Sequence, residues 1–428
     1  MDAIERRIVA FTASAHGLVH TYELSIPILL TVWIAEFSTT AATLGAVVTV
    51  GYGLFGVGAL PAGVVVDRFG SKPVILACLL GMAGSFLLVG AAPTLPVLAL
   101  ALGVWGVTAS VYHPAGLALL STAVDRRGTA LGYHGIGGNL GIALGPLAAV
   151  VLLVAFDWRV VAALLTLPAL LVAGYGYTVD VETALARATD DSRGDESDGD
   201  GSSRAAADGG VVGSLARVAG DTRALLTLGF GLVLLFVTFS GLYYRTFLTF
   251  LPDLLGDALG GFAGGVDGLG PAGPGGASFD LGRYLYVAVL LVGVPGQYLG
   301  GRIADRVPPE RGLAALMTVL VLLALSFVAA TGALWSFLLV SGLLGVALFT
   351  VQPLSQATVA AYTPPGSRGL SFGYTYLAIF GVGSLGAGLA GFVLTVAGRR
   401  ELFVVLAGLA ACGALVALAV GRFGTARD

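Results

Sequence analysis

Apolar residues run in long uninterrupted stretches along most of the chain, and polar residues gather in short segments between them. A helix needs about 20 mostly apolar residues to cross a bilayer, and continuous apolarity favours helices over a transmembrane barrel. The pattern therefore predicts an all-α protein with twelve membrane-spanning helices. We expect them at residues 8–34, 42–66, 73–91, 95–122, 129–155 and 159–179, and again at 222–250, 283–304, 312–331, 334–362, 369–397 and 401–421.

Composition excludes several other classes of protein. Of the 428 residues, 57% are hydrophobic and only 11% are charged, and the mean hydropathy is +0.92. Soluble globular proteins carry about 25% charged residues, so a soluble enzyme, a nucleic-acid binder and a disordered chain are excluded. Cys78 and Cys412 fall in apolar spans, which favours small packing residues over a disulfide or a metal pair.

Basic residues are distributed unequally between the two faces of such a protein. With the N-terminus inside, 17 of the 22 Lys and Arg residues fall on the inner face, four fall on the outer face, and Arg245 lies within a span. By the positive-inside rule we expect both termini to be cytoplasmic, in the plasma membrane of the cell.

One long segment is polar instead of apolar. Residues 180–208 carry nine acidic residues and three arginines, a composition that favours a solvated linker over a regulatory tail. A cytoplasmic acidic linker over 180–221 would separate an N-terminal six-helix bundle, 1–179, from a C-terminal six-helix bundle, 222–428. A glycine-rich external loop is expected at 255–282 within the second bundle.

Short motifs recur at nearly constant spacing in the two halves. Three pairs are separated by 238, 239 and 241 residues: Asp67-Arg68 with Asp305-Arg306, His113-Pro114 with Gln352-Pro353, and Arg127-Gly128 with Arg368-Gly369. The halves are therefore interpreted as parallel repeats related by an axis along the membrane normal. Pro27 and Pro252 add a fourth pair, which aligns His20 with Arg245.

The first of these motifs resembles a family signature. The stretch Gly63-Val-Val-Val-Asp67-Arg68-Phe-Gly70-Ser-Lys72 is similar to the loop 2–3 motif of the major facilitator superfamily and departs from it at Ser71. The second copy keeps Asp305 and Arg306. The resemblance implies two six-helix bundles with pseudo-two-fold symmetry, a monomer, and a cytoplasmic gate at these two loops. The alternative is that the loop charges only mark topology.

Small residues and two further stretches narrow the resemblance. Gly137, Gly141 and Gly145 follow small-xxx-small spacing, and with Pro146 they resemble part of an antiporter-associated motif. These glycines, with those of spans eight and eleven, are interpreted either as a rocking interface between the halves or as tight packing. The sequences of His16–Glu23, Val111–Ala115 and Gly137–Leu147 resemble those of the fosmidomycin-resistance branch of the superfamily. This resemblance implies proton-driven drug efflux.

Ionisable side chains inside spans are the candidate functional residues, because they are costly in a bilayer. His16, His20 and Glu23 have the spacing i, i+4, i+7 and share one helix face. Histidine titrates near physiological pH, so this face could take up and release a proton. The alternative is a structural hydrogen-bond network.

Three more ionisable residues lie in spans. His113 precedes a helix-bending proline, and it either contacts substrate or proton or satisfies the local backbone. His134 lies one turn into span five, and it either shares that role or merely lies near the membrane interface. Arg245 would bind an anionic substrate, pair with Glu23 or extend to the membrane surface. The remaining cavity-lining candidates are Tyr22, Asn139, Tyr243, Tyr244, Gln297, Gln352 and Gln356.

Metal and cofactor sites are not expected. His16 and His20 have metal-ligand spacing, but the sequence shows neither a cysteine nor a third histidine that would cluster with them. Gly268–Gly273 spells a dinucleotide-binding pattern, yet no strand precedes it and no helix follows, so it is interpreted as a loop.

The leading hypothesis is a secondary active transporter without enzyme activity, one that exports a small amphipathic or anionic compound in exchange for protons by alternating access. Its partners are the substrate, protons and the bilayer. The alternatives are a proton-coupled uptake symporter for a small organic anion, and a membrane redox or metal protein that uses the intramembrane histidines.

Overall fold

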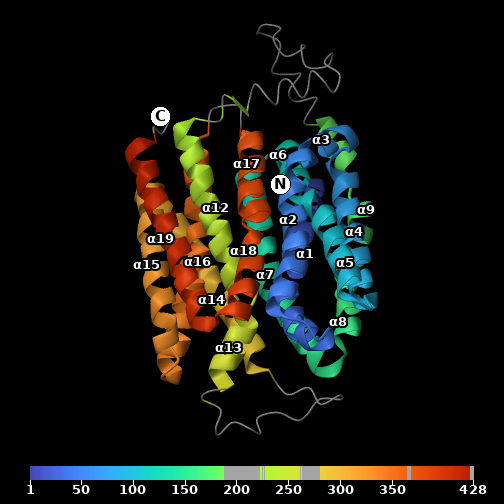
Figure 1. Cartoon of the computed structure of the whole chain (residues 1–428). Helices are drawn as coiled ribbons and strands as arrows, with labels where there is room; N and C mark the ends of the chain where they lie inside the picture. Colours follow the sequence, from blue (N-terminus) through green and yellow to red (C-terminus); the bar gives the residue numbers. More distant parts are fainter. Residues whose placement is uncertain are drawn as a thin grey trace.

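The computed structural model describes residues 1–187, 222–223, 225, 227–260, 262, 280–363 and 368–424. In this part of the chain, helices stand side by side in two bundles, one from each half of the sequence (Figure 1). Eleven helices are long and apolar enough to cross a membrane, and a bent pair that meets at 48° supplies a twelfth span. The prediction of twelve spans is confirmed.

Every predicted span corresponds to one helix or to two or three consecutive helices. The N-terminal bundle contains α1 (Ala3–Glu36), α2 (Ala41–Val57), α3 (Ala59–Phe69), α4 (Ser71–Ala91), α5 (Leu95–Ser110), α6 (Tyr112–Ala123), α7 (Arg127–Ala155), α8 (Trp158–Leu164) and α9 (Thr166–Tyr177). The C-terminal bundle contains α12 (Leu228–Leu248), α13 (Leu251–Gly260), α14 (Leu281–Ala304), α15 (Pro309–Ala330), α16 (Leu334–Ala361), α17 (Arg368–Tyr376), the π-helix η2 (Leu377–Val382), α18 (Leu385–Val396) and α19 (Arg399–Phe423).

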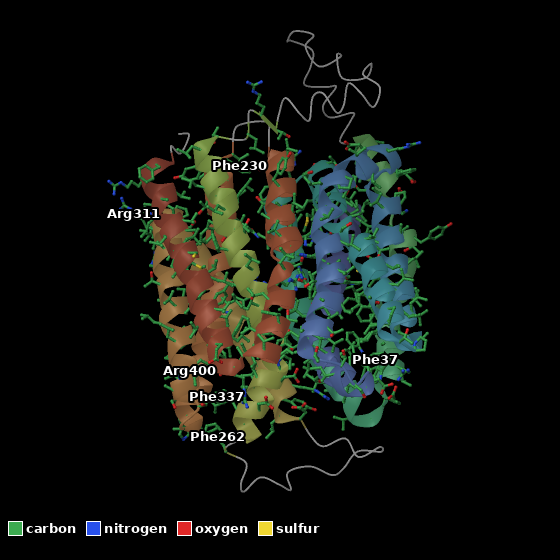
Figure 2. The ribbon with its side chains drawn as sticks, viewed as in Figure 1. Phe37, Phe230, Phe262, Arg311, Phe337 and Arg400 are labelled. Carbon is green, nitrogen blue, oxygen red and sulfur yellow. The ribbon has the colours of Figure 1, made fainter. Side chains whose placement is uncertain are left out.

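Both chain ends lie at the same end of the bundles, which we call the termini side; the opposite end is the far side (Figure 1). Figure 2 shows Arg311 at the termini side and Arg400 at the far side. Apolar side chains cover the flanks: Leu171 is 74% exposed and Trp335 is 81% exposed. An apolar surface of this kind matches a lipid environment.

Two of the predicted connections lie largely outside the described residues. These are 188–221 of the acidic linker, and 261 and 263–279 of the glycine-rich loop. Both ends of the segment expected as a loop, 255–282, are helical, because α13 continues to Gly260 and α14 begins at Leu281. The Asp280 side chain accepts hydrogen bonds from the backbone of Gly282 and Arg283, which caps α14.

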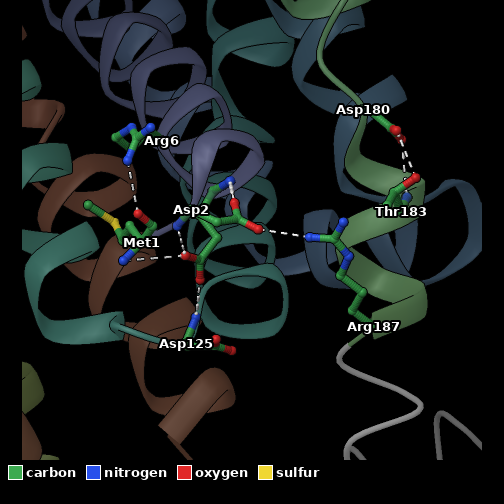
Figure 3. A network of polar contacts seen from close by, with 8 residues as sticks. Met1, Asp2, Arg6, Asp125, Asp180, Thr183 and Arg187 are labelled. Atoms are coloured by element: carbon green, nitrogen blue, oxygen red, sulfur yellow. Dashed lines mark hydrogen bonds and ion pairs between the residues drawn. The ribbon is translucent and has the colours of Figure 1, made fainter.

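The first helix is anchored at its start by a polar network (Figure 3). Asp2 and Glu5 form a capping box, and the Glu5 carboxylate also accepts a bond of 2.7 Å from the backbone of Asp125. Arg187 donates to Asp2 at 2.8 Å. The hydrogen bond from the Glu5 backbone holds the pKa of the Asp2 carboxyl below its usual value. The network ties α1 to the connection between α6 and α7.

The glycines of span five pack within one bundle. A Cβ on Gly137 would lie 2.2 Å from the backbone oxygen of Ala13, and one on Gly141 would lie 1.9 Å from that of Gly17. Both partners belong to α1, which is in the same half. The interpretation of these glycines as a rocking interface between halves is therefore wrong, and tight packing of α7 on α1 is the observed reason for them.

The most extensive contact between the two halves, which we call the seam, is that of α2 with α18 and η2, and α7 meets α14 in a smaller one. A Cβ on Gly45 would lie 2.6 Å from the backbone oxygen of Ala387, and one on Gly56 would lie 1.9 Å from the backbone nitrogen of Gly381. Thr49 donates to the backbone oxygen of Ser384 at 3.1 Å across the same seam. Here backbones meet with almost no side chain between them.

Candidate functional site

A buried ion pair joins the two bundles. Glu23 lies on α1 and Arg245 on α12, and their residues are 1% and 2% exposed. The Arg245 Nη2 atom donates to Glu23 Oε1. Because the two residues belong to different halves, this contact links the bundles at the core of the protein. It is also the ion-pair alternative that the sequence left open for Arg245.

Aromatic rings enclose the guanidinium group. Its central carbon lies 3.8 Å from the centre of the Tyr52 ring, 5.4 Å from that of Tyr244 and 5.6 Å from that of Phe380. These distances are within the range of cation–π attraction. The Tyr52 hydroxyl also donates to the backbone oxygen of Glu23 at 3.1 Å. The pair is thus shielded from water by both halves.

A line of hydrogen bonds extends from the ion pair along α1. His20 Nδ1 lies 2.6 Å from the second Glu23 oxygen, Oε2. His20 Nε2 lies 3.1 Å from His16 Nε2, and His16 Nδ1 lies 2.8 Å from the backbone oxygen of His134. The face predicted from the i, i+4, i+7 spacing is therefore a connected chain of polar groups.

All four histidines of the sequence gather around this chain. The His16 and His134 rings stack with centres 4.0 Å apart, and His113 meets His16 edge-on at 5.2 Å. Tyr112 and Tyr376 close the group: the Tyr112 hydroxyl lies 3.2 Å from His134 Nε2, and the Tyr376 ring centre lies 4.9 Å from that of His113.

The histidine group includes the potential ligands of a metal ion. One ring nitrogen each from His16, His20 and His113 lie within 4.8 Å of one another. A third histidine therefore does cluster with the pair on α1, and the premise behind expecting no metal site is wrong. A single sequence does not show this proximity, because His113 is 93 residues away along the chain and on another helix.

Other candidates lie apart from the ion pair. Tyr22 points into its own bundle, where its hydroxyl donates to the backbone of Leu165 at 3.0 Å. Tyr243 packs beside Phe247, and Asn139 is half-buried on α7. Gln297 donates to Gln352 at 3.3 Å within the C-terminal bundle, and Gln356 is exposed.

The sequence profile of the Major Facilitator Superfamily matches residues 12–285 and 233–424. The chain belongs to the Major Facilitator Superfamily. The superfamily is one of membrane transporters, so the chain is a multi-pass membrane transporter and its fold is the twelve-helix fold of these proteins.

Individual relatives and structures add detail. The chain is 39% identical over 103 residues to the puromycin resistance protein of Streptomyces alboniger, covering 23% of this chain and 20% of that protein. It is 37% identical over 109 residues to an uncharacterized MFS-type transporter of Mycobacterium tuberculosis, a quarter of each chain. These matches span a quarter or less of the relatives' lengths.

Solved structures share the fold over nearly the whole chain. A bacterial homologue of the human lysosomal transporter Spinster, in an inward-facing conformation, superposes with a TM-score of 0.69 over 99% of this chain and 95% of its own. The xylose transporter of E. coli gives 0.68 over 99% of this chain and 100% of its own. Both are 15% identical to this chain, so the likeness concerns the fold.

The superfamily loop motif lies on the termini side. Gly70 adopts φ +80, which favours glycine, and Lys72 donates to the backbone oxygen of Val179 at 2.7 Å, joining this loop to the segment after α9. Asp67 and Arg68 are exposed, as are Asp305 and Arg306 in the second copy. A Cβ on Gly63 would meet no atom within 4 Å.

On the far side, Asp253 gives the protein a pH-dependent stability. Burial, and then Asp257 and Asp280, raise its pKa from 3.8 to about 7. One of its carboxylate oxygens has no hydrogen-bond partner among the described residues. Between these two pKa values the Asp253 carboxyl is protonated in the folded protein but ionised in the unfolded chain. The free energy of unfolding therefore falls as pH rises from about 4 to 7 and then levels off.

We expect the Asp253→Asn variant to melt at a higher temperature than the wild type at mildly alkaline pH and to lose this part of the pH slope. Thermal unfolding in detergent, followed by tryptophan fluorescence at several pH values, measures both. Parallel pH curves for the two proteins would contradict the assignment. The Glu36→Gln variant serves as the control, because Glu36 is an exposed acid on the same side.

Proposed function

We propose that this chain is a proton-coupled secondary transporter that exports a small amphipathic or anionic compound by alternating access, with Glu23, Arg245 and the histidine group as its working residues. The observation that carries the proposal is the buried Glu23–Arg245 pair, which connects α1 and α12 from different halves. A charge inside a membrane protein is costly, and one that joins two moving bodies can control their motion.

The proposed coupling follows from competition at Glu23. Its carboxylate has two oxygens, one bound to Arg245 and the other to His20. Protonation removes the negative charge that attracts Arg245 and so weakens the link between the halves. An amphipathic substrate that competes with the proton for this carboxylate would favour the opposite state. Such a difference in binding between two states is what coupled transport requires.

We further propose that the termini side faces the cytoplasm. The unequal distribution of Lys and Arg supports this orientation, and the acidic linker and the loop motif then lie inside the cell. Asp67, Arg68, Asp305 and Arg306 would form contacts of the cytoplasmic gate in the conformation where that side closes.

The test is transport in proteoliposomes after a pH jump, with puromycin and the phosphonate fosmidomycin as probe compounds. We expect proton-driven flux in the wild type and its loss in the Glu23→Gln/His20→Ala double variant. Glu36→Gln is the matched control: it also neutralises an acid of α1, but one that is 35% exposed and paired with Arg159. Full proton-driven flux in the double variant would remove these residues from the mechanism.

A second candidate is uptake of a small organic anion together with a proton. It is favoured by the position of Arg245, which is free to bind a carboxylate or phosphonate only after Glu23 has been neutralised, so that proton and anion would load together. The direction of probe movement under an imposed proton gradient separates the two. Movement of the probe against the proton flow supports export, and movement with it supports uptake.

A further inference from the structure

The hydrogen-bond partners of His16 and His20 determine which ring nitrogens carry hydrogen. His16 Nδ1 faces the backbone oxygen of His134 at 2.8 Å, and a carbonyl oxygen only accepts, so this nitrogen must donate. His20 Nδ1 faces Glu23 Oε2 at 2.6 Å. The Glu23 carboxylate is ionised because it also accepts from Arg245, so His20 Nδ1 must donate as well.

In both rings the Nε2 atom then carries a lone pair when the ring is neutral, because a neutral imidazole has only one N–H. These two Nε2 atoms face each other at 3.1 Å. Two lone pairs at this distance repel each other, whereas one N–H between them makes a hydrogen bond of normal length. The contact therefore requires a positive species between the rings.

We propose that His16 and His20 form a single proton-binding site, in which one proton is shared between the two Nε2 atoms as an imidazole–imidazolium pair. A proton from water forms the N–H bond on one Nε2, and the other Nε2 accepts the hydrogen bond. This deepens the function proposed above: its role in transport rests on that function, but the existence of the site does not.

A metal ion fits the observed geometry less well than a proton. Zinc would need nitrogens at about 2.0–2.1 Å and usually four ligands in all. His113 supplies the third candidate nitrogen, yet the three nitrogens are spread over as much as 4.8 Å. No fourth His, Cys, Asp or Glu among the described residues joins these three at the same spacing. The two Nε2 atoms already stand at a hydrogen-bond distance, so a proton needs no rearrangement.

The shared proton lies within reach of other polar groups on every neighbouring element. Glu23 and Arg245, from α1 and α12, cancel each other's charge, so the protonated pair leaves the group with one net positive charge. The titratable side chains in contact with the pair are Glu23 on α1, Tyr112 and His113 on α6, and His134 on α7. One contact further away are Arg245 on α12, which binds Glu23, and Tyr376 on α17, which lies against His113. Tyr52 on α2 and Tyr244 on α12 lie against Arg245.

The site gives Glu23 a nearby proton donor. From His16 to Glu23 the chain advances by seven residues, about 10 Å at about 1.5 Å per residue. A proton that enters at His16 can pass to His20, whose opposite nitrogen already donates to the carboxylate that holds Arg245. The pair can therefore hold a proton beside the link between the halves without first breaking that link.

Nitrogen NMR of the full-length protein in lipid nanodiscs tests the site directly. Selective ¹⁵N-histidine labelling gives a simple spectrum, because the chain has only four histidines. We expect Nδ1–H on both His16 and His20, and a coupling across the hydrogen bond between their two Nε2 atoms at acidic pH. The absence of that coupling at every pH, or an unprotonated Nδ1 on either ring, would overturn the proposal.

Proton counting provides a second, independent measurement. We expect His16→Gln and His20→Gln each to abolish the same uptake of about one proton per chain on acidification, and the double variant to abolish no more than either alone, because the titration belongs to the pair. Loss of about two protons in the double variant would show independent sites.

His134→Gln keeps the backbone oxygen that orients His16, and we expect it to retain the Nε2–Nε2 coupling.

These readouts separate the site from the transport proposal. Coupling between the nitrogens without proton-driven flux would leave the site standing and overturn the proposed function. Proton-driven flux without the coupling would overturn only the site. A stoichiometric metal in the purified protein, whose removal by chelation shifts both Nε2 signals, would show that a metal and not a proton lies between the rings.

Discussion

Replacing Glu23 by glutamine is expected to abolish proton-driven transport and to destabilise the protein by about 3–5 kcal/mol, since breaking a buried ion pair leaves an uncompensated charge. The remaining charge is that of Arg245, which is 2% exposed and pairs with no other acidic side chain among the described residues. Arg245→Met is expected to have a similar effect, because it leaves the buried Glu23 carboxylate without its arginine and with only the hydrogen bond to His20. Thermal unfolding in detergent and flux in proteoliposomes measure the two consequences.

The double variant Glu23→Gln/Arg245→Met separates stability from function. Removing both charges is often neutral for stability, so we expect much of the lost thermal stability to return while transport stays absent. If the double variant is as unstable as either single variant, the unpaired charge does not explain the loss. If it transports, the pair does not couple protons to movement.

Replacing Gly56 by alanine is expected to separate the seam between the halves and to reduce transport about ten- to hundred-fold. The new Cβ would lie 1.9 Å from the backbone nitrogen of Gly381, and neither backbone can move aside alone. Overpacking costs about 1–3 kcal/mol, and each 1.4 kcal/mol changes an equilibrium about tenfold. The packed state of α2 against η2 would lose population by that factor.

Gly84→Ala is the control, because a Cβ at Gly84 would meet no atom within 4 Å. Spin labels at Ser121 and Val307, both exposed on the termini side, report the separation of the halves once the exposed Cys412 has been replaced by serine. We expect a broader distance distribution in Gly56→Ala and an unchanged one in Gly84→Ala. Unchanged transport and distances in both variants would show that the seam tolerates separation.

The fold is predictable from the sequence because the bilayer imposes it. Long apolar runs must form helices there, and the repeated motifs show the two halves. The bends are less predictable: the second span breaks at Gly58 and span eleven contains the π-helix η2. Glycine is common in both regions and in straight helices too, so only the packing of neighbouring backbones decides where a helix bends.

The candidate site is predictable in part. Ionisable residues in spans stand out by their cost, and the alignment of Pro27 with Pro252 matches Arg245 with His20, which is one helical turn before Glu23. Tyr52 and Phe380, which enclose Arg245, give no such signal, because an aromatic ring in an apolar helix can face lipid, core or site equally well. The glycines of span five show the same limit: spacing indicates close packing, but it does not identify the partner helix.

The most direct test of the central claim is the distance between spin labels at Thr94 and Ala333, exposed positions on the far side of the two bundles. If the Glu23–Arg245 pair holds the halves together, Glu23→Gln will show a wider distance at mildly alkaline pH than the wild type, and acidification will move the wild type toward the variant. The same distances in both proteins at both pH values would contradict the account.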